Sequence, residues 1–148
     1  MEEKKSLFEE LGGRPQLMKI VKHFYDKVYA HPWLGLYFKN TPQENIENQQ
    51  ADFMTGALGG PKIYAGRSPN DAHPHLFITE ELYVLRTHLM METLKELNVP
   101  QAIIDRWIKS EDAFKASMVK TSIDQCHGRY KTEEILAFEN PEKIKKAS

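Results

Sequence analysis

Apolar residues recur along most of this chain at spacings of three and four, which is the period of a helix buried along one face. In the first long segment, residues 16–30, they fall at Leu17, Ile20, Val21, Phe24 and Val28. No stretch of useful length alternates apolar and polar residues with the period of two that marks a strand. The pattern therefore predicts an all-α fold.

Other segments show the same period, or are too apolar for a solvent-exposed loop. The predicted helical elements are residues 7–11, 14–30, 33–38, 42–58, 79–98 and 101 to about 125. Thr41, with Glu44 three residues later, is expected to cap the element at 42–58. After residue 125 the chain becomes polar and rich in Lys and Glu. We therefore predict a domain at residues 1–125 followed by a polar C-terminal extension at 126–148.

The stretch between the predicted helices at 42–58 and 79–98 has glycine and proline where a helix would stop, beginning with Gly59, Gly60 and Pro61. About a dozen irregular residues follow, which is long for a connection in a compact domain. Loops of this length are usually functional or stabilised by a ligand. This segment is therefore where we expect a functional site.

The composition is that of an ordinary globular domain. Of 148 residues, 41% are apolar and 28% charged, with 20 Lys and Arg against 21 Asp and Glu. A net charge of −1 gives no electrostatic footprint for nucleic acid or an anionic membrane. No apolar run approaches the roughly 18 residues of a membrane span, and no apolar signal region follows the N-terminus. The single cysteine, Cys126, cannot form an internal disulfide, so we expect a cytoplasmic protein.

His73 is the candidate metal ligand. It ends the irregular stretch and is followed closely by Leu76, Phe77 and Ile78. A neutral imidazole held among apolar groups is what a heme iron requires on its proximal side. His75 competes for this role, but residues two apart point to different faces, so only one of the two is expected to reach a given iron.

Gln50 interrupts the apolar stripe of the helix predicted at 42–58. A buried amide without partners costs on the order of 1–3 kcal/mol. Gln50 therefore either caps a backbone group or lies at the rim of a pocket, or it faces a cavity together with Tyr25. In the second case both residues would donate hydrogen bonds to a bound molecule, and a partly anionic ligand would strengthen those bonds about twofold.

Several aromatic residues fit either an ordinary core or the walls of a slot for a flat, apolar porphyrin. They are Phe38, Phe53, Tyr64 and Phe77. Other chemistries have no matching motif, because the sequence lacks a Gly-rich phosphate loop, a G-x-S-x-G nucleophile elbow and the Cys/His spacing of a zinc site.

Five motifs, taken in order, resemble those of the truncated (2-on-2) hemoglobins over about residues 7–121. They are residues 7–13 (LFEELGG), 24–28 (FYDKV) with 36–38 (LYF), 50–54 (QADFM), 57–66 (ALGGPKIYAG), and His73 with Leu76 and Ile78. The short span between Tyr64 and His73 resembles the first group of the family.

The resemblance implies a 2-on-2 helical sandwich around a heme b. His73 matches the proximal heme ligand and Tyr25 the distal tyrosine. Ile46 and Gln50 match the two distal positions that gate the bound ligand and donate a hydrogen bond to it. The remaining positions that match heme contacts are Phe38, Phe53, Met54, Tyr64, Leu76 and Ile78.

Arg86 departs from the family pattern. It lies thirteen residues after His73, where relatives commonly have an apolar or aromatic residue near the heme. Either the register shifts locally, or Arg86 reaches a heme propionate or the surface.

The resemblance implies binding of dioxygen, nitric oxide and carbon monoxide at a five-coordinate iron. Oxygen transport, oxidation of nitric oxide to nitrate with the help of a reductase, peroxidase-like activity and redox sensing are all compatible with such a protein. The competing hypothesis is a heme-free helical interaction or regulatory module, in which His73, Gln50 and Tyr25 are satisfied polar residues of the core. No nucleic-acid partner and no membrane span are expected under either hypothesis.

Overall fold

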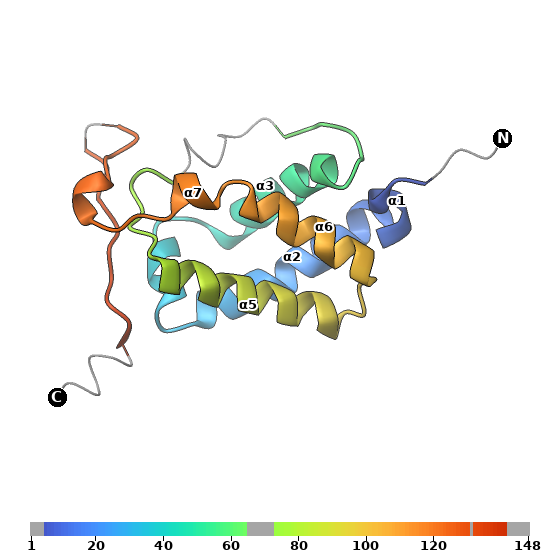
Figure 1. Ribbon diagram of the computed structural model, residues 1–148, viewed down its shortest axis with the longest axis horizontal. Coiled ribbons are helices and arrows are strands. Elements are labelled where there is room, and N and C mark those ends of the chain that lie inside the picture. The colour runs from blue at the N-terminus through green and yellow to red at the C-terminus, as the bar shows by residue number, and fades with distance from the viewer. Residues whose placement is uncertain (1–4, 65–72, 131, 142–148) are drawn as a thin grey trace.

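The computed structural model describes residues 5–64, 73–130 and 132–141, and these are mainly helical, which confirms the all-α prediction. Figure 1 shows the elements, which are α1 (Leu7–Leu11), α2 (Gly13–Ala30), η1 (Leu34–Phe38), α3 (Gln43–Ala57), α5 (Glu80–Glu96), α6 (Gln101–Asp112), α7 (Lys115–Met118) and η2 (Ile123–Gln125). Within the described ranges, β pairing consists of two isolated bridges, Leu76 with Leu136 and Ile78 with Val119. Residues 65–72 of the predicted irregular stretch lie outside the described part of the chain.

Two pairs of helices form a sandwich. Helix α2 packs on α3 and α5 packs on α6, and the pairs meet through contacts of α2 with α5 and of α3 with α6. Figure 1 shows α1 at one end of this sandwich and the chain that follows α7 at the other end. This is the 2-on-2 arrangement predicted from the sequence.

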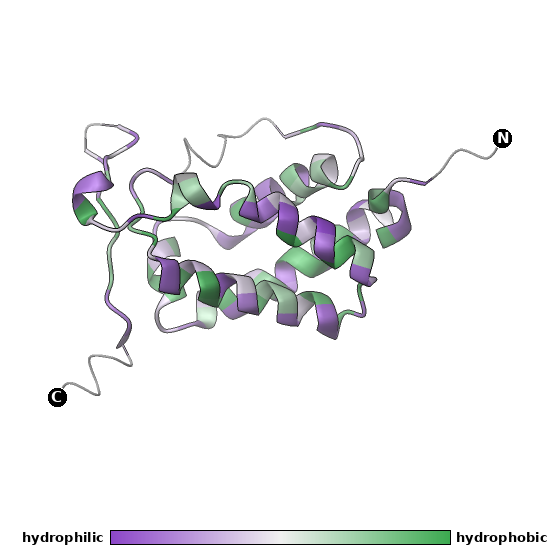
Figure 2. Ribbon diagram, in the orientation of Figure 1, coloured by the Kyte–Doolittle hydropathy of each residue, from purple (hydrophilic) through white to green (hydrophobic). Residues whose placement is uncertain are grey.

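The sandwich is stabilised by apolar side chains that the helices turn toward one another, and Figure 2 shows hydrophobic and hydrophilic positions alternating around each long helix. Among the described residues, the larger apolar side chains with no exposed surface are Leu17, Ile20, Val21, Phe24, Met54, Met90, Leu94, Ile103 and Trp107. Full burial of one such side chain contributes roughly 1.5–3 kcal/mol, so tertiary packing outweighs the helix propensity of the individual segments.

Two helices begin at the capping residues that the sequence indicates. The hydroxyl oxygen of Ser6 accepts a hydrogen bond at 3.2 Å from the backbone N–H three residues later, at the start of α1. Thr79 does the same for α5, also at 3.2 Å. At the end of α2 the chain becomes extended at His31, directly before Pro32, as the restriction on residues preceding proline predicts.

Thr41 does not cap α3, and the last main helix is shorter than predicted. Pro42, with an extended backbone, occupies the N-cap of α3 in place of Thr41, so the helix begins one residue later and has no side-chain cap. The last main helix ends at Asp112 instead of near residue 125. The chain bends there, and the ring of Phe114 packs edge-on against Phe53 of α3 with ring centres 5.9 Å apart.

The described part of the predicted C-terminal extension packs on the sandwich around η1. Leu136 is 3% exposed. The indole N–H of Trp33 donates to the carbonyl of Phe138 at 2.8 Å, and the backbone N–H of Phe138 donates to the hydroxyl of Tyr37 at 3.0 Å. Since Trp33 and Tyr37 are themselves buried, this segment completes the cover of the core at that end.

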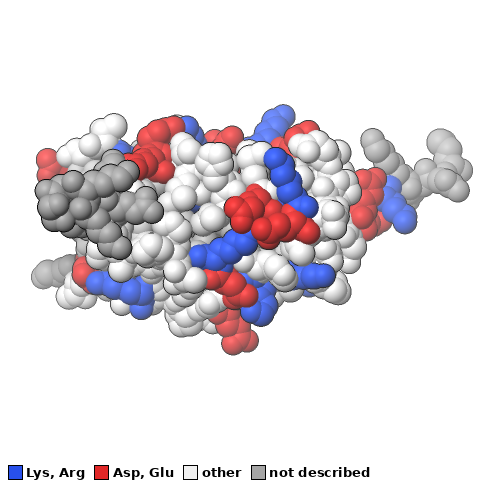
Figure 3. Space-filling view, turned by 90° about the horizontal axis from the view of Figure 1, so that it is seen from below, with Lys and Arg blue, Asp and Glu red and all other residues white. Residues whose placement is uncertain are grey.

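Charged residues cover the outer faces with both signs intermixed, as Figure 3 shows for one face. Lys27 of α2, for example, pairs with Glu92 and Glu96 of α5 at 3.0 and 2.9 Å. Such exposed pairs each contribute about 0–1 kcal/mol. In the described ranges, none of the helices has both the length and the apolar character needed to cross a membrane.

Candidate functional site

Tyr25 lies inside the sandwich on α2 and is 4% exposed. Its ring packs edge-on against Phe24 at 4.9 Å and against Phe38 of η1 at 5.9 Å between ring centres. Burial raises the pKa of the Tyr25 hydroxyl to about 12, although the charge of Arg86 opposes this shift. The phenol is therefore protonated at neutral pH and can donate a hydrogen bond.

Helix α3 carries Ile46, Gln50 and Phe53 on one side, because residues three and four apart share a helix face. All three are partly buried. The ring of Phe53 packs edge-on against Tyr64 at 5.6 Å between ring centres. The side-chain nitrogen of Gln50 donates to Oε1 of Glu111 on α6 at 3.4 Å. Gln50 thus has a polar partner inside the sandwich.

Arg86 pairs with Glu111, a partner that the sequence analysis did not consider. Its Nη1 and Nη2 donate to the two carboxylate oxygens at 2.8 and 3.1 Å. The guanidinium carbon of Arg86 lies 5.0 Å from the centre of the Phe24 ring. Phe24 directly precedes Tyr25 in the sequence. Glu111 is 7% exposed and also accepts a hydrogen bond from the indole N–H of Trp107 at 2.9 Å. The interior of the sandwich therefore holds an ion pair next to the predicted distal residues.

Most of the predicted heme-contact positions are only partly buried. Met54 has no exposed surface, whereas Phe38, Ile46, Phe53, Tyr64, Leu76 and Ile78 all retain some. Phe38 lies on η1, and Ile46 and Phe53 lie on α3. Tyr64 ends the first described range, and Leu76 and Ile78 lie in the segment before α5. Large apolar side chains in a core are usually fully buried, and a flat apolar ligand inserted among them would remove this surface from water. These partly exposed apolar side chains are of the kind that a heme requires around it.

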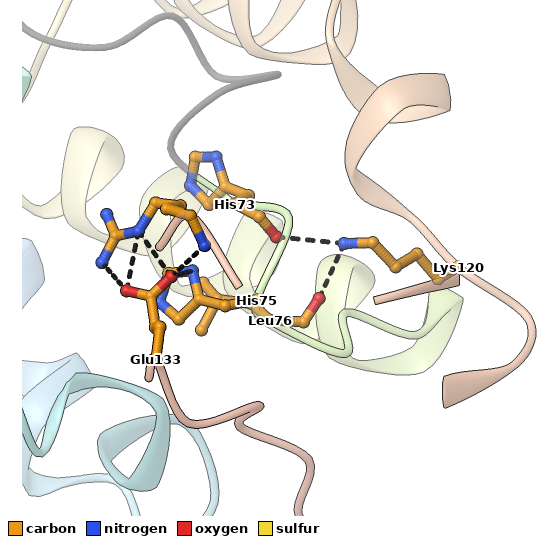
Figure 4. A network of polar contacts seen from close by, with 6 residues as sticks. His73, His75, Leu76, Lys120 and Glu133 are labelled. Carbon is orange, nitrogen blue, oxygen red and sulfur yellow. Dashed lines mark hydrogen bonds and ion pairs between the residues drawn. The ribbon is translucent and has the colours of Figure 1, made fainter. Parts of the chain in front are cut away.

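Residues 73–78 form a short non-helical segment that is fixed from the C-terminal side, as Figure 4 shows. The ammonium group of Lys120 donates to the carbonyls of His73 and Leu76 at 3.0 and 2.7 Å. The two isolated bridges described above join the same segment to residues 119 and 136. The backbone that carries the half-buried His73 is thus held in place without a helix of its own.

His75 belongs to a separate cluster. Its Nδ1 lies 3.6 Å from a carboxylate oxygen of Glu133. Hydrogen bonds from Arg129 are the main cause that lowers the pKa of Glu133 to about 2, against the opposing effect of burial. Figure 4 shows the imidazole of His75 beside the carboxylate of Glu133. The arrangement favours His73 over His75 as the candidate ligand.

Sequence reasoning missed Glu111, Lys120 and Glu133. Glu111 left a detectable signal, because it follows Trp107 by four residues and so lies on the apolar face of α6. This interruption is of the same kind as that of Gln50 on α3. Lys120 and Glu133 lie in irregular segments, where no periodicity distinguishes an inward-facing residue from an exposed one.

The sequence has clear relatives. A family model for bacterial-like globins matches residues 6–120. The chain is 38% identical over 104 residues to a group 1 truncated hemoglobin of Tetrahymena thermophila, which covers 70% of this chain and 86% of that protein. It is 34% identical over 109 residues to a group 1 truncated hemoglobin of Tetrahymena pyriformis, covering 74% and 90% of the two proteins.

Solved structures agree with these relatives. The truncated hemoglobin of Tetrahymena pyriformis in its Fe(III) form superposes with a TM-score of 0.72 at 32% identity, over 79% of this chain and 100% of that chain. A group II truncated hemoglobin from Bacillus anthracis gives a TM-score of 0.69 at 25% identity, over 81% and 95% of the two chains. By sequence and by fold, this chain belongs to the bacterial-like globin family and is a truncated hemoglobin with group 1 relatives.

Proposed function

We propose that this protein binds a heme b through the imidazole of His73 and takes up dioxygen, nitric oxide and carbon monoxide next to Tyr25 and Gln50. Membership of the truncated hemoglobin family supports a heme-binding and gas-binding protein. Bound heme would supply an iron atom with one coordination position free for a diatomic gas. The choice of His73, Tyr25 and Gln50 follows from their match to the motifs of this family and is supported by the burial of Tyr25 and the inward contact of Gln50.

The observation that carries the proposal is the group of six partly buried apolar side chains at the predicted contact positions. Four of them lie on the elements that also hold Gln50 or His73, namely Ile46 and Phe53 on α3 and Leu76 and Ile78 in residues 73–78, and Phe38 of η1 contacts the ring of Tyr25. Covering them with a porphyrin would add apolar burial worth roughly 25 cal/mol per Å². The same side chains would keep water away from the bound gas.

Tyr25 and Gln50 would act as hydrogen-bond donors to that gas. The pKa of about 12 keeps the hydroxyl of Tyr25 protonated, and Gln50 carries two N–H groups, of which one is directed at Glu111. Ile46 offers no nitrogen that could take the free coordination position. A hydrogen bond to a partly charged ligand is worth about 1.5–3 kcal/mol, so dioxygen release is expected to be slow.

We propose oxidation of nitric oxide to nitrate as the reaction that this pocket supports. Nitric oxide, dioxygen and one electron together give nitrate, so a reductase must supply an electron for each turnover. The donors at Tyr25 and Gln50 would hold dioxygen while nitric oxide arrives. The nitrate formed when the dioxygen complex of the purified protein meets nitric oxide tests this reaction, and a yield near zero would exclude it.

We further infer a cytoplasmic protein, because the single cysteine cannot form an internal disulfide.

Storage or transport of oxygen would require fast release, and two donors beside the bound gas favour slow release. Oxidation of nitric oxide therefore fits this pocket better than oxygen transport.

An absorption spectrum of the purified chain reconstituted with hemin tests the heme proposal directly. Wild-type protein and the His75→Ala variant should both show an intense Soret band. The His73→Ala variant should lose the Soret band, or lose the spectrum of the five-coordinate ferrous form. Added imidazole should restore the lost spectrum. The reverse result for the two variants would assign the ligand to His75. A wild-type protein without a Soret band would support the heme-free helical module.

A further inference from the structure

The ion pair between Arg86 and Glu111 joins α5 to α6, the helices that pack on the two elements carrying the proposed donors. Arg86 lies on α5 and Glu111 on α6, whereas Tyr25 and Gln50 lie on α2 and α3. The side chain of Glu111 is 7% exposed and that of Arg86 is 26% exposed. A charge pair with one buried and one half-buried partner is costly to desolvate and is often no more stabilising than apolar residues of the same volume. Its presence in the sandwich therefore calls for a role other than stability.

The hydrogen-bonding capacities of the two charged groups constrain their neighbours. An ionised carboxylate can only accept hydrogen bonds. Because Gln50 directs its nitrogen at Glu111 at 3.4 Å, the opposite amide orientation would place its carbonyl oxygen against a negative charge. Glu111 thus selects the orientation in which the amide nitrogen faces inward, and the second N–H of that nitrogen is left for another acceptor.

Arg86 constrains Tyr25 in the complementary way. A guanidinium can only donate hydrogen bonds. It lies over the Phe24 ring beside Tyr25, and its charge and hydrogen bonding oppose the rise in the pKa of the Tyr25 hydroxyl. A phenol oxygen that faces a donor-only group must direct its own proton elsewhere. Arg86 thus favours the rotamer in which the hydroxyl of Tyr25 donates to a different partner.

We propose that Arg86 and Glu111 are positioning residues that commit Tyr25 and Gln50 to donate hydrogen bonds to the bound gas. This inference rests on the function proposed above and deepens it. It predicts a preference for ligands whose outer atom is a good acceptor, such as dioxygen, over carbon monoxide, whose outer atom is a poor one. Neither charged residue needs to touch the ligand.

The test uses the full-length protein loaded with heme and three variants. Arg86→Leu combined with Glu111→Leu removes both charges together, which avoids leaving one buried charge unpaired. Glu111→Gln keeps the shape of the side chain, but its amide can donate hydrogen bonds as well as accept them. This variant replaces the double variant in the test if the double variant folds poorly. Lys27→Met is the matched control, because the side chain of Lys27 is 25% exposed, close to that of Arg86, and makes its ion pairs with Glu92 and Glu96 between α2 and α5.

Infrared spectra of bound carbon monoxide report the direction of the donors independently of any activity. Wild-type protein and Lys27→Met should show one dominant C–O stretching band. The double variant and Glu111→Gln should show additional bands at higher frequency, because the hydroxyl and the amide then adopt more than one orientation. Dioxygen release should become at least 10-fold faster in the double variant. In the wild-type background, Tyr25→Phe should also accelerate release at least 10-fold. Introduced into the double variant, Tyr25→Phe should accelerate release by a further factor of less than 3.

Two kinds of failure are distinguishable. If the double variant and Glu111→Gln keep the wild-type band, and release of dioxygen stays within twofold of wild type, the positioning role is excluded while heme and gas binding stand. If the wild-type protein shows neither a Soret band nor a carbon monoxide band, the proposed function and this inference are excluded together.

Discussion

Replacing Lys120 by methionine would test whether the segment that carries His73 is held from the C-terminal side. Lys120 is 9% exposed, and its ammonium group donates to the carbonyls of His73 and Leu76 at 3.0 and 2.7 Å. Methionine keeps most of the aliphatic chain and has no donor, so the packing is largely retained while both hydrogen bonds are lost.

The expected effect follows from the other partners of these carbonyls. The N–H of Leu76 donates to His73 at 3.0 Å and that of Ile78 donates to Leu76 at 3.1 Å, so each carbonyl keeps one hydrogen bond. Each lost bond is then expected to cost about 1 kcal/mol, below the range of about 1.5–3 kcal/mol for bonds to charged groups. Burial lowers the pKa of Lys120, and removing this partly desolvated charge recovers some free energy. We expect a net loss of about 1–2 kcal/mol in the free energy of unfolding.

Urea unfolding of the heme-free protein measures this loss, and the rate of heme transfer to an excess of a heme-accepting protein measures its consequence. If heme leaves when residues 73–78 open, a loss of about 1–2 kcal/mol makes transfer roughly 5- to 30-fold faster. Lys39→Met is the matched control, since the side chain of Lys39 is 41% exposed and pairs with Glu134 at the surface at 3.1 Å. If Lys120→Met unfolds and loses heme as Lys39→Met does, residues 73–78 do not depend on Lys120.

Three further predictions concern pH and backbone geometry. The pKa of Tyr25 is raised from 10.0 to about 12, so its stabilising contribution is complete below about pH 10 and is lost as pH rises toward 12. Urea unfolding at pH 9 and pH 11 should therefore show a larger decline for wild type than for Tyr25→Phe, and equal declines would contradict the burial of this phenol. The pKa of Glu133 is lowered from 4.5 to about 2, so its contribution is present above about pH 4.5 and lost toward pH 2. Glu133→Gln should accordingly show a flatter decline of stability in acid, and an unchanged acid limb would refute the role of its ion pair. Gly35→Ala should destabilise the protein by about 1–3 kcal/mol in thermal unfolding, because a Cβ would lie 2.8 Å from the carbonyl oxygen of Tyr29. Gly56→Ala within α3, where the nearest atom lies 3.6 Å away, should instead stabilise by about 0.5–1 kcal/mol, and similar effects of the two substitutions would count against the close approach at Gly35.

Local sequence patterns predicted the elements whose ends and faces are determined locally. Helices α2 and α5 follow the apolar period, and α5 begins where Thr79 offers a hydroxyl oxygen to the first turn. The end of α6 was missed because the bend after Asp112 depends on Phe114 packing against Phe53, a contact between distant parts of the chain. The attachment of the C-terminal segment is of the same kind, since Trp33 and Phe138 are 105 positions apart. No local pattern records such a contact.

The candidate site shows the same division between local and long-range information. Gln50 and Glu111 each interrupt an apolar stripe, and each interruption is visible in the sequence, but their pairing depends on α3 packing against α6. Arg86 was unexpected at its position because its compensating charge lies 25 positions away on another helix. Glu111 in turn is tolerated in the interior because Trp107 and Gln50 also donate to it. Since removing any one of these groups leaves another under-satisfied in a region of low dielectric constant, they constrain one another more than any of them is constrained by its neighbours in the sequence.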